Sequence, residues 1–418
     1  MAVSRGSIHH EISEDLASLF SVYSNPAFFL SRPKAHVREL TCQAVNNLFP
    51  DSEVTLFPFA RTAFYAILQS LSLPPGSEVL LTPFNISPML DIIYALGYKP
   101  VFVEINTVDF GPRIDDLIQK MKRKPGCFLL TYLFGYVPHL NEILRVCDSH
   151  NVPLIEDISQ AIGATYSGQS LGTFGFAAFY SASLTKYIDA YNGAFVVTNS
   201  STLHLSLIKF TQNCLSDPGR SRIISTIQKT LFWNIALSHK FFTCFTFPVL
   251  QIIKRLNFAF FETLLGPSIL PNGSNTLPSY YFEDISVIQC KSLVFYIQKL
   301  ALLLKQRRES VNLALPFFNP VAITHKFNAS PSYWQYVCRV SDVSSARHLL
   351  FSHGIETGTT KLPNLSEESS LDMCVAQDLK TTVLFIPVHK HLGRRYFAKI
   401  YYLLNHAGLL ITESNDLS

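Results

Sequence analysis

Two neighbouring stretches decide the fold: LIEDISQAIGA, residues 154–164, and GFAAFYSASLTKYIDAYNGAFVVT, residues 175–198. In the first, an apolar run leads directly into Glu156–Asp157, so it reads as a short buried strand that ends on carboxylates. In the second, a strand leads through serines and threonines to a single lysine, Lys186, and then to a glycine-containing turn and another strand. Parallel sheets bind ligands at the carboxyl ends of their strands. The two stretches therefore predict a site with an acid and a lysine at one sheet edge.

On the N-terminal side of this region, short apolar segments alternate with amphipathic ones. Strands are predicted at Val54–Phe59, Glu78–Thr82, Pro100–Ile105, Cys127–Tyr132 and Pro153–Glu156, and helices at Ala35–Leu48, Arg61–Leu71, Pro88–Leu96, Ile114–Lys122 and Leu140–His150. Such alternation is typical of βαβ units, whose parallel sheet is covered by helices on both faces. We expect an N-terminal segment over 1–49 and a large α/β domain over 50–202.

Residues 203–284 break this rhythm and are predicted to form a hydrophobic helical insertion. Apolar residues dominate it, but Lys229, His239, Lys240, Lys254 and Arg255 interrupt them, so no stretch reaches the ~18–20 uncharged apolar residues of a membrane-spanning helix. Two interpretations stay open: a core or dimer-interface helix pair, or an amphipathic attachment to a membrane surface through residues 203–279.

The remaining chain, 285–418, is predicted to form a long helix and a small C-terminal α+β domain. The long helix is expected over Ile285–Leu315, strands at Tyr333–Arg339 and Val383–Pro387, and helices at Val343–His353 and Arg394–His406.

The predicted sheet edge has the groups that pyridoxal 5'-phosphate (PLP) chemistry requires. A lysine amine forms a Schiff base with the cofactor aldehyde, and an acid keeps the pyridine nitrogen protonated; Lys186 and Asp157 are the candidates. A phosphate needs hydroxyls and free N–H groups at a helix start, which Thr62, Ala63 and Ser181 can provide. Gln160 lies one helical turn beyond Asp157 and is a candidate for the ring oxygen.

Several segments resemble the DegT/DnrJ/EryC1/StrS family of sugar aminotransferases, PLP enzymes of fold type I. They are PGSEVLLTPFNISPMLDIIYALGYKPVFVEI, IEDISQAIGATYSGQSLGTFG, the spacing from Gly175 to Lys186, HGIETGTTKLP and LFIPVHKHL. The similarity covers about residues 50–200 and 285–410 and spans both predicted domains.

The resemblance implies that Lys186 is the Schiff-base lysine, that Asp157 pairs with the pyridine nitrogen, and that Thr62, Ala63 and Ser181 hold the phosphate. It implies a homodimer that transfers an amino group from glutamate to a keto-sugar, commonly nucleotide-linked, for polysaccharide or glycoconjugate synthesis. Residue Ile86 falls where the family stacks an aromatic ring on the cofactor.

The chain departs from the family pattern in the shell around the lysine. Arg61 stands where the family has a glycine before the phosphate-binding threonine, and Phe282 lies near the position of the partner-subunit asparagine. These departures leave two alternatives open: a catalytically altered, membrane-associated protein of the same fold, or a PLP enzyme that acts on a lipid-linked or other non-sugar substrate.

Composition sets the remaining bounds. A net charge of +4 over 418 residues, without a basic run, does not favour nucleic acid. The eight cysteines are scattered without a CxxC pair, which indicates neither a metal site nor a disulfide framework. The N-terminus has acidic residues and no apolar core, so a cytoplasmic location is expected, with membrane association open through the insertion.

Overall fold

The computed structural model describes residues 2–4, 11–256, 277–318, 328–360, 362, 364–366 and 374–411. A seven-stranded sheet forms the centre of the molecule, in the order β1-β9-β8-β5-β4-β2-β3. Its strands are β1 (Glu53–Phe57), β2 (Glu78–Leu81), β3 (Lys99–Phe102), β4 (Cys127–Thr131), β5 (Leu154–Asp157), β8 (Ala177–Ala182) and β9 (Gly193–Thr198). Strands β2, β3, β4, β5 and β8 run parallel, whereas β9 pairs antiparallel with both β8 and β1. The predicted large, mostly parallel sheet is confirmed.

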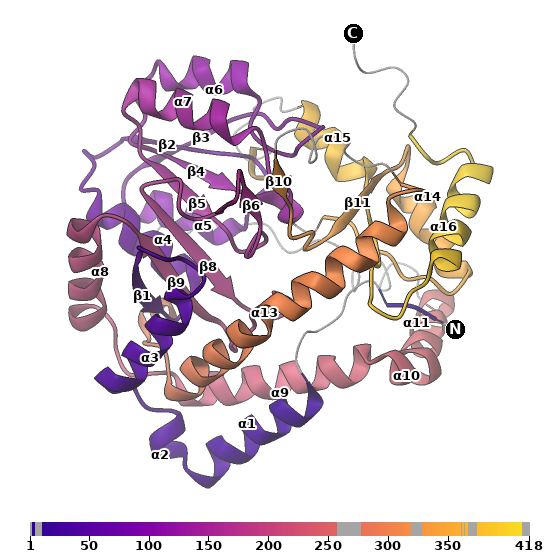
Figure 1. Cartoon of the computed structure of the whole chain (residues 1–418), viewed down its shortest axis with the longest axis horizontal. Helices are drawn as coiled ribbons and strands as arrows, with labels where there is room; N and C mark the ends of the chain where they lie inside the picture. Colours follow the sequence, from indigo (N-terminus) through magenta and orange to yellow (C-terminus); the bar gives the residue numbers. More distant parts are fainter. Residues whose placement is uncertain are drawn as a thin grey trace.

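Helices cover both faces of this sheet, as expected (Figure 1). One face packs against α4 (Ala60–Ser70), α5 (Ser87–Ala95) and α8 (Ser201–Asn213), and the other against α3 (Ala35–Asn46), α6 (Ile114–Met121), α7 (Leu140–His150) and α13 (Val287–Ala314). Along β4, Leu129 joins the first core while Phe128 and Leu130 join the second. This alternation follows from the two-residue period of a strand, and both faces stay apolar because both are covered.

The 28-residue helix α13 connects the two parts of the molecule. Its start is fixed by a capping box: the Ser286 side chain accepts from the backbone N–H of Gln289, and the Gln289 side chain accepts from the backbone N–H of Ser286. Among the described residues, α13 is the one unbroken helix long and apolar enough to cross a membrane, but 56% of that window is buried inside the protein. It is therefore explained as a core helix.

A smaller α+β unit follows α13. Strands β11 (Tyr336–Arg339) and β12 (Val383–Ile386) pair antiparallel, and helices α14 (Val343–Ser352), α15 (Cys374–Thr382) and α16 (Arg394–His406) accompany them. A three-stranded sheet, β10-β6-β7, joins this unit to the large domain through β10 (Ala329–Ser330), β6 (Thr165–Tyr166) and β7 (Gln169–Ser170). The expected small C-terminal domain is present.

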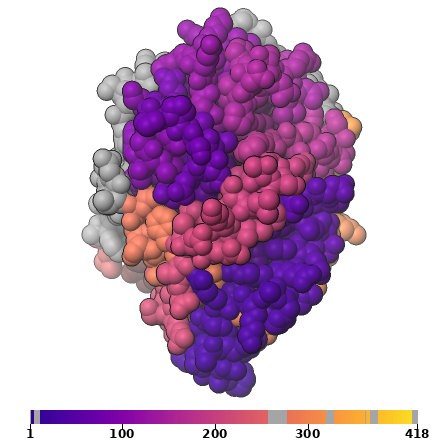
Figure 2. Space-filling view, turned by 90° about the vertical axis from the view of Figure 1, so that its left-hand side faces the viewer, coloured from indigo at the N-terminus to yellow at the C-terminus, as the bar shows by residue number. Residues whose placement is uncertain are grey.

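The N-terminal helices and the insertion lie together along one edge (Figure 1). They comprise α1 (Ile12–Ser24), α2 (Pro26–Phe29), α9 (Arg220–Leu237), α10 (His239–Phe241), the π-helical turn η2 (Phe242–Thr246) and α11 (Phe247–Leu256). Helix α1 packs on α9, and Figure 2 shows the N-terminal residues (indigo) covering the lower part of one face. Helix α8, which begins near the predicted start of the insertion, packs on β1 and α4 instead. The domain limits themselves stay predictions.

Candidate functional site

Asp157 is the last residue of β5 and lies beside β8, so it occupies the predicted carboxyl edge of the sheet. The side chain is buried, and the backbone N–H of Ser159 donates to Oδ1 over 2.9 Å. Burial raises the pKa of Asp157, while the hydrogen bonds from Ser159 and the charge of Lys186 oppose that rise. The structure thus places an oriented carboxylate where the sequence predicts it.

Lys186 lies in the turn after β8, and its backbone N–H donates to the carbonyl of Ser183 over 3.1 Å. Its Nζ lies 3.8 Å from the centre of the Trp334 ring, and the indole Nε1 donates to the carbonyl of Thr185 over 3.0 Å. Burial lowers the pKa of Lys186 to about 8, and the carboxylate of Asp157 acts in the opposite direction. The predicted acid and lysine are therefore electrostatically coupled, and half of the amine is neutral near pH 8.

Three serine hydroxyls gather beside this pair. The Ser159 Oγ accepts from the backbone N–H of Ser181 over 3.1 Å, and the Ser181 Oγ donates to the Ser183 Oγ over 3.2 Å. Ser181 was predicted to contact a phosphate, and the structure places its hydroxyl among two others at the end of β8. Such a cluster can supply hydrogen-bond donors to an anion.

In the first turn of α4, the groups predicted to bind phosphate already make hydrogen bonds within the chain. The Thr62 Oγ1 donates to the carbonyl of Tyr281 over 2.5 Å, and the Ala63 N–H donates to the carbonyl of Phe59 over 3.0 Å. The guanidinium of Arg61 lies 4.3 Å from the Phe59 ring centre and 4.4 Å from that of Tyr281. Both groups predicted to bind phosphate here thus have partners within the chain, so their role as phosphate ligands stays a prediction.

The other two predicted cofactor contacts lie nearby but serve local structure as well. The Gln160 Oε1 accepts from the backbone N–H of Phe134 over 2.8 Å, which holds a residue at φ +60°. Ile86 is the residue before helix α5, and its side chain is 39% exposed. The roles of Gln160 and Ile86 as cofactor contacts stay predictions.

The second carboxylate of the sheet edge, Glu156, is structural. It is fully buried and accepts from the Tyr132 hydroxyl over 2.6 Å and from the backbone N–H groups of Gly172, Phe174 and Gly175. This explains why β5 ends with two adjacent acids: side chains alternate across the sheet, so one carboxylate holds a loop and the other lies on the side of the lysine.

Trp334 lies at the site although no sequence pattern predicts it there. It precedes strand β11 in the second domain, and no local signal connects it with a lysine 148 positions earlier in the chain. An aromatic residue at the start of a strand is usually a core residue. Only the docking of the two domains reveals its contact with Lys186.

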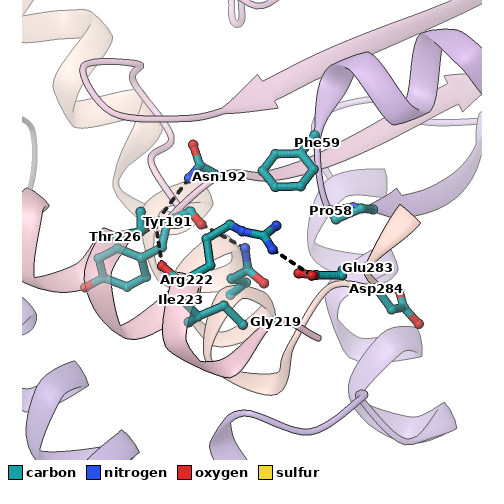
Figure 3. A pocket seen from close by; sticks show the side chains of 11 residues that line it. Pro58, Phe59, Tyr191, Asn192, Gly219, Arg222, Ile223, Thr226, Glu283 and Asp284 are labelled. Atoms are coloured by element: carbon teal, nitrogen blue, oxygen red, sulfur yellow. Dashed lines mark hydrogen bonds and ion pairs between the residues drawn. The ribbon is translucent and has the colours of Figure 1, made fainter. Parts of the chain in front are cut away.

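A pocket lies where the turn after Lys186 meets α9 and the segment before α13 (Figure 3). Arg222 pairs with Glu283 over 2.6 Å, and the Asn192 Nδ2 donates to the Thr226 Oγ1 over 3.4 Å. Its polar side chains are thus largely paired with one another, which indicates a junction between segments. Among the described residues, no group of three or more His, Cys, Asp and Glu side chains could hold a metal ion.

Residues 59–235 match the DegT/DnrJ/EryC1/StrS aminotransferase family. The chain is 34% identical over 142 residues to a pleiotropic regulatory protein of Geobacillus stearothermophilus, covering 34% of this chain and 38% of that one. It is 29% identical over 138 residues to a GDP-perosamine synthase of Vibrio cholerae, covering 33% and 38%. The matched region thus spans about two fifths of the length of these relatives.

Solved structures match over nearly the whole chain. Helicobacter pylori PseC, an aminotransferase of pseudoaminic acid biosynthesis, has a TM-score of 0.71 at 16% identity and covers 97% of this chain and 99% of its own. An aminotransferase from Psychrobacter cryohalolentis has a TM-score of 0.70 at 15% identity and covers 94% and 96%. At such identities the likeness establishes the fold, and it confirms the predicted architecture of fold type I.

Proposed function

We propose that the chain is a PLP-dependent aminotransferase whose cofactor lysine is Lys186, which the match of residues 59–235 to the DegT/DnrJ/EryC1/StrS aminotransferase family supports. Its amino donor is an amino acid, most simply glutamate, and its acceptor is a nucleotide-linked keto-sugar. Lys186 and Asp157 act directly on the cofactor, while Ser181 and Thr62 contact its phosphate.

The observation that carries this proposal is the coupled pair of Lys186 and Asp157. An ordinary surface lysine is protonated at neutral pH, whereas burial lowers the pKa of this amine to about 8. An amine with such a pKa can attack an aldehyde and can also take and return a proton near neutrality. The carboxylate opposite it is held by Ser159 and is ready to accept a hydrogen bond from a ring N–H.

The residues present fit PLP at its ring end. When bound, PLP withdraws electrons from the substrate carbon next to the nitrogen. The chain's contribution would be to orient the Asp157 carboxylate through Ser159, to keep Lys186 Nζ able to move a proton, and to place the Trp334 ring against that amine. At the phosphate end, Thr62 must exchange its hydrogen bond with the Tyr281 carbonyl for one with the phosphate.

The substrate class is supported by the relatives. One similar protein is a GDP-perosamine synthase, and another, 27% identical over 146 residues, is a UDP-N-acetyl-3-dehydro-alpha-D-glucosamine 3-aminotransferase of Acidithiobacillus ferrooxidans. Both names contain a sugar linked to a nucleoside diphosphate, and the second also names an amino transfer. We propose the same acceptor class here, together with a homodimer and a cytoplasmic location.

Cofactor attachment tests the lysine assignment. The purified chain is incubated with PLP, reduced with borohydride and digested, and the peptides are weighed by mass spectrometry. We expect the pyridoxyl mass on the peptide that contains Lys186 and its loss in Lys186→Met. The exposed Lys209 on α8 provides a matched control, since Lys209→Met should leave labelling unchanged. Labelling spread over surface lysines would contradict the assignment.

Single-turnover reactions test the chemistry. With the cofactor bound and no acceptor present, glutamate should yield one equivalent of 2-oxoglutarate per site. The return of the cofactor to its aldehyde form is then measured with nucleotide-linked keto-sugars and, separately, with free keto-sugars. Turnover by the free sugars alone would contradict the proposed acceptor class, and light scattering on the same sample tests the dimer.

A second candidate function rests on the altered first turn of α4. The Thr62 hydroxyl already bonds to Tyr281, and Arg61 lies among aromatic rings. This arrangement is the observation that favours the alternative, in which the protein keeps the family fold but does not catalyse transamination. Cofactor attachment at Lys186 without any half-reaction across a panel of amino donors would support that candidate.

A further inference from the structure

The segment α10–α11 presents an apolar stripe outward that the core does not use. We call Phe241, Phe245, Val249, Ile252 and Leu256 the outer stripe; they are between 40% and 82% exposed. Their spacing of three and four residues places them on one side of a continuous helical segment. Helix α9 adds further exposed apolar residues, of which Phe232 is 63% exposed.

The opposite side of the same segment is anchored in the protein. Phe242 and Phe247 are 1% and 6% exposed and pack with Ala2 and Phe351 in a small separate core. The Thr243 hydroxyl also lies 3.1 Å from the carbonyl of Ala2. These contacts with the small core fix the rotation of the helical segment about its axis. The outer stripe therefore faces away from the protein.

The charged residues of the segment α9–α11 itself are all basic, and one of them, Arg222, is paired with Glu283. Between Asp217 and Glu262 the sequence has no acidic residue, but it has six basic ones. These are Arg220, Arg222, Lys229, Lys240, Lys254 and Arg255. Lys240 and Arg255 are exposed on the segment that bears the stripe. Exposed apolar side chains with basic residues beside them are the pattern of a helix that binds the surface of an anionic bilayer.

We propose that α9–α11 attaches the protein to an anionic membrane surface, with the outer stripe inserted at the headgroup level. A symmetric contact with a second copy through this segment would bring Lys240 and Arg255 of each copy close to the same residues of the other, which opposes association. A spanning arrangement does not fit either, because α9 and α10–α11 meet at 61° and both pack against the protein. The proposal goes beyond transamination and does not depend on it.

Vesicle sedimentation with the full-length chain tests the proposal. Vesicles of phosphatidylcholine alone are compared with vesicles that also contain phosphatidylglycerol. We expect binding to the acidic vesicles that weakens as salt is added. Each basic residue near an anionic surface contributes about 1 kcal/mol, so Lys240→Gln with Arg255→Gln should weaken binding about thirty-fold.

Apolar variants test the insertion of the stripe. Phe245→Ser with Ile252→Ser should weaken binding to the acidic vesicles by about tenfold or more. In the unmodified chain both apolar side chains move from water into the bilayer on binding, and the variant loses that gain. Leu205→Ser on α8 is the matched control, since Leu205 is 66% exposed but lies outside the segment. It should bind like the unmodified chain.

Two results would overturn the proposal. The first is an unmodified chain that stays in the supernatant with acidic vesicles at low salt. The second is a change of oligomeric state in Phe245→Ser with Ile252→Ser, measured by light scattering, which would show that a second copy covers the stripe. Neither readout requires enzymatic activity, so a failed transamination assay leaves this test intact.

Discussion

The pKa of Lys186 provides the most direct test of the site's electrostatics. Burial lowers it to about 8, and the Asp157 carboxylate holds it above the value that burial alone would give. Asp157→Asn removes that charge with little change in shape. The neutral form of the amine should therefore become more favourable, and the pKa should fall further.

The expected size of this change follows from the charge pair. A neighbouring opposite charge typically shifts a pKa by about one to three units. With a pKa of about 8, about a tenth of the amine is neutral at pH 7. A fall of one unit would raise that fraction to about half, and its reactivity toward acylating reagents about fivefold.

Trace acetylation of the cofactor-free chain across a pH series measures the change. The labelled fraction at Lys186 is read by mass spectrometry, and the exposed Lys209 is measured in the same sample as an internal reference. Glu142→Gln, at an exposed position on α7, controls for the loss of a carboxylate elsewhere. A midpoint that stays or rises in Asp157→Asn would refute the charge-pair argument, and an unmodified Lys186 that titrates like Lys209 would refute the burial argument.

Two stability predictions follow from the packing around the sheet. Gly163 and Gly97 both have φ +74°, but a Cβ on Gly163 would meet the Leu304 side chain at 2.2 Å, whereas Gly97 has nothing within 4 Å. In urea unfolding, Gly163→Ala should therefore cost about 1–3 kcal/mol more than Gly97→Ala; equal losses would mean that Leu304 moves aside freely. Glu156→Gln should cost about 2–3 kcal/mol in the same assay, because an amide NH2 group would then face buried N–H donors. A loss below about 0.5 kcal/mol would contradict the structural role of Glu156.

Much of the fold could be predicted because its signals are local. The short apolar runs that form β2, β4 and β5 are bounded by turns, and the helices between them show clear periodicity. The helix over Arg394–His406 was predicted at its observed limits. By contrast, α1 (Ile12–Ser24) was not predicted, because it is mixed in composition and much of its stability comes from packing against α9.

The site divides in the same way. Asp157 and Lys186 were predictable because both lie close to strand ends in the sequence that forms the sheet edge. Trp334 and Tyr281 were not, because each reaches the site from another part of the chain. Their contacts depend on docking between segments, which no short pattern encodes.

The turn that carries Lys186 is tied down by residues far outside the family-matched region. The Tyr191 hydroxyl bonds to the buried carboxylate of Asp15 over 3.0 Å, and the Tyr191 carbonyl accepts from the Gln289 Nε2 over 2.8 Å. Two stretches that are remote in the sequence thus converge on one short turn. Substitutions at positions 15, 191 and 289 should consequently be non-additive, and a fragment limited to residues 59–235 would lose both of these contacts to its own lysine turn.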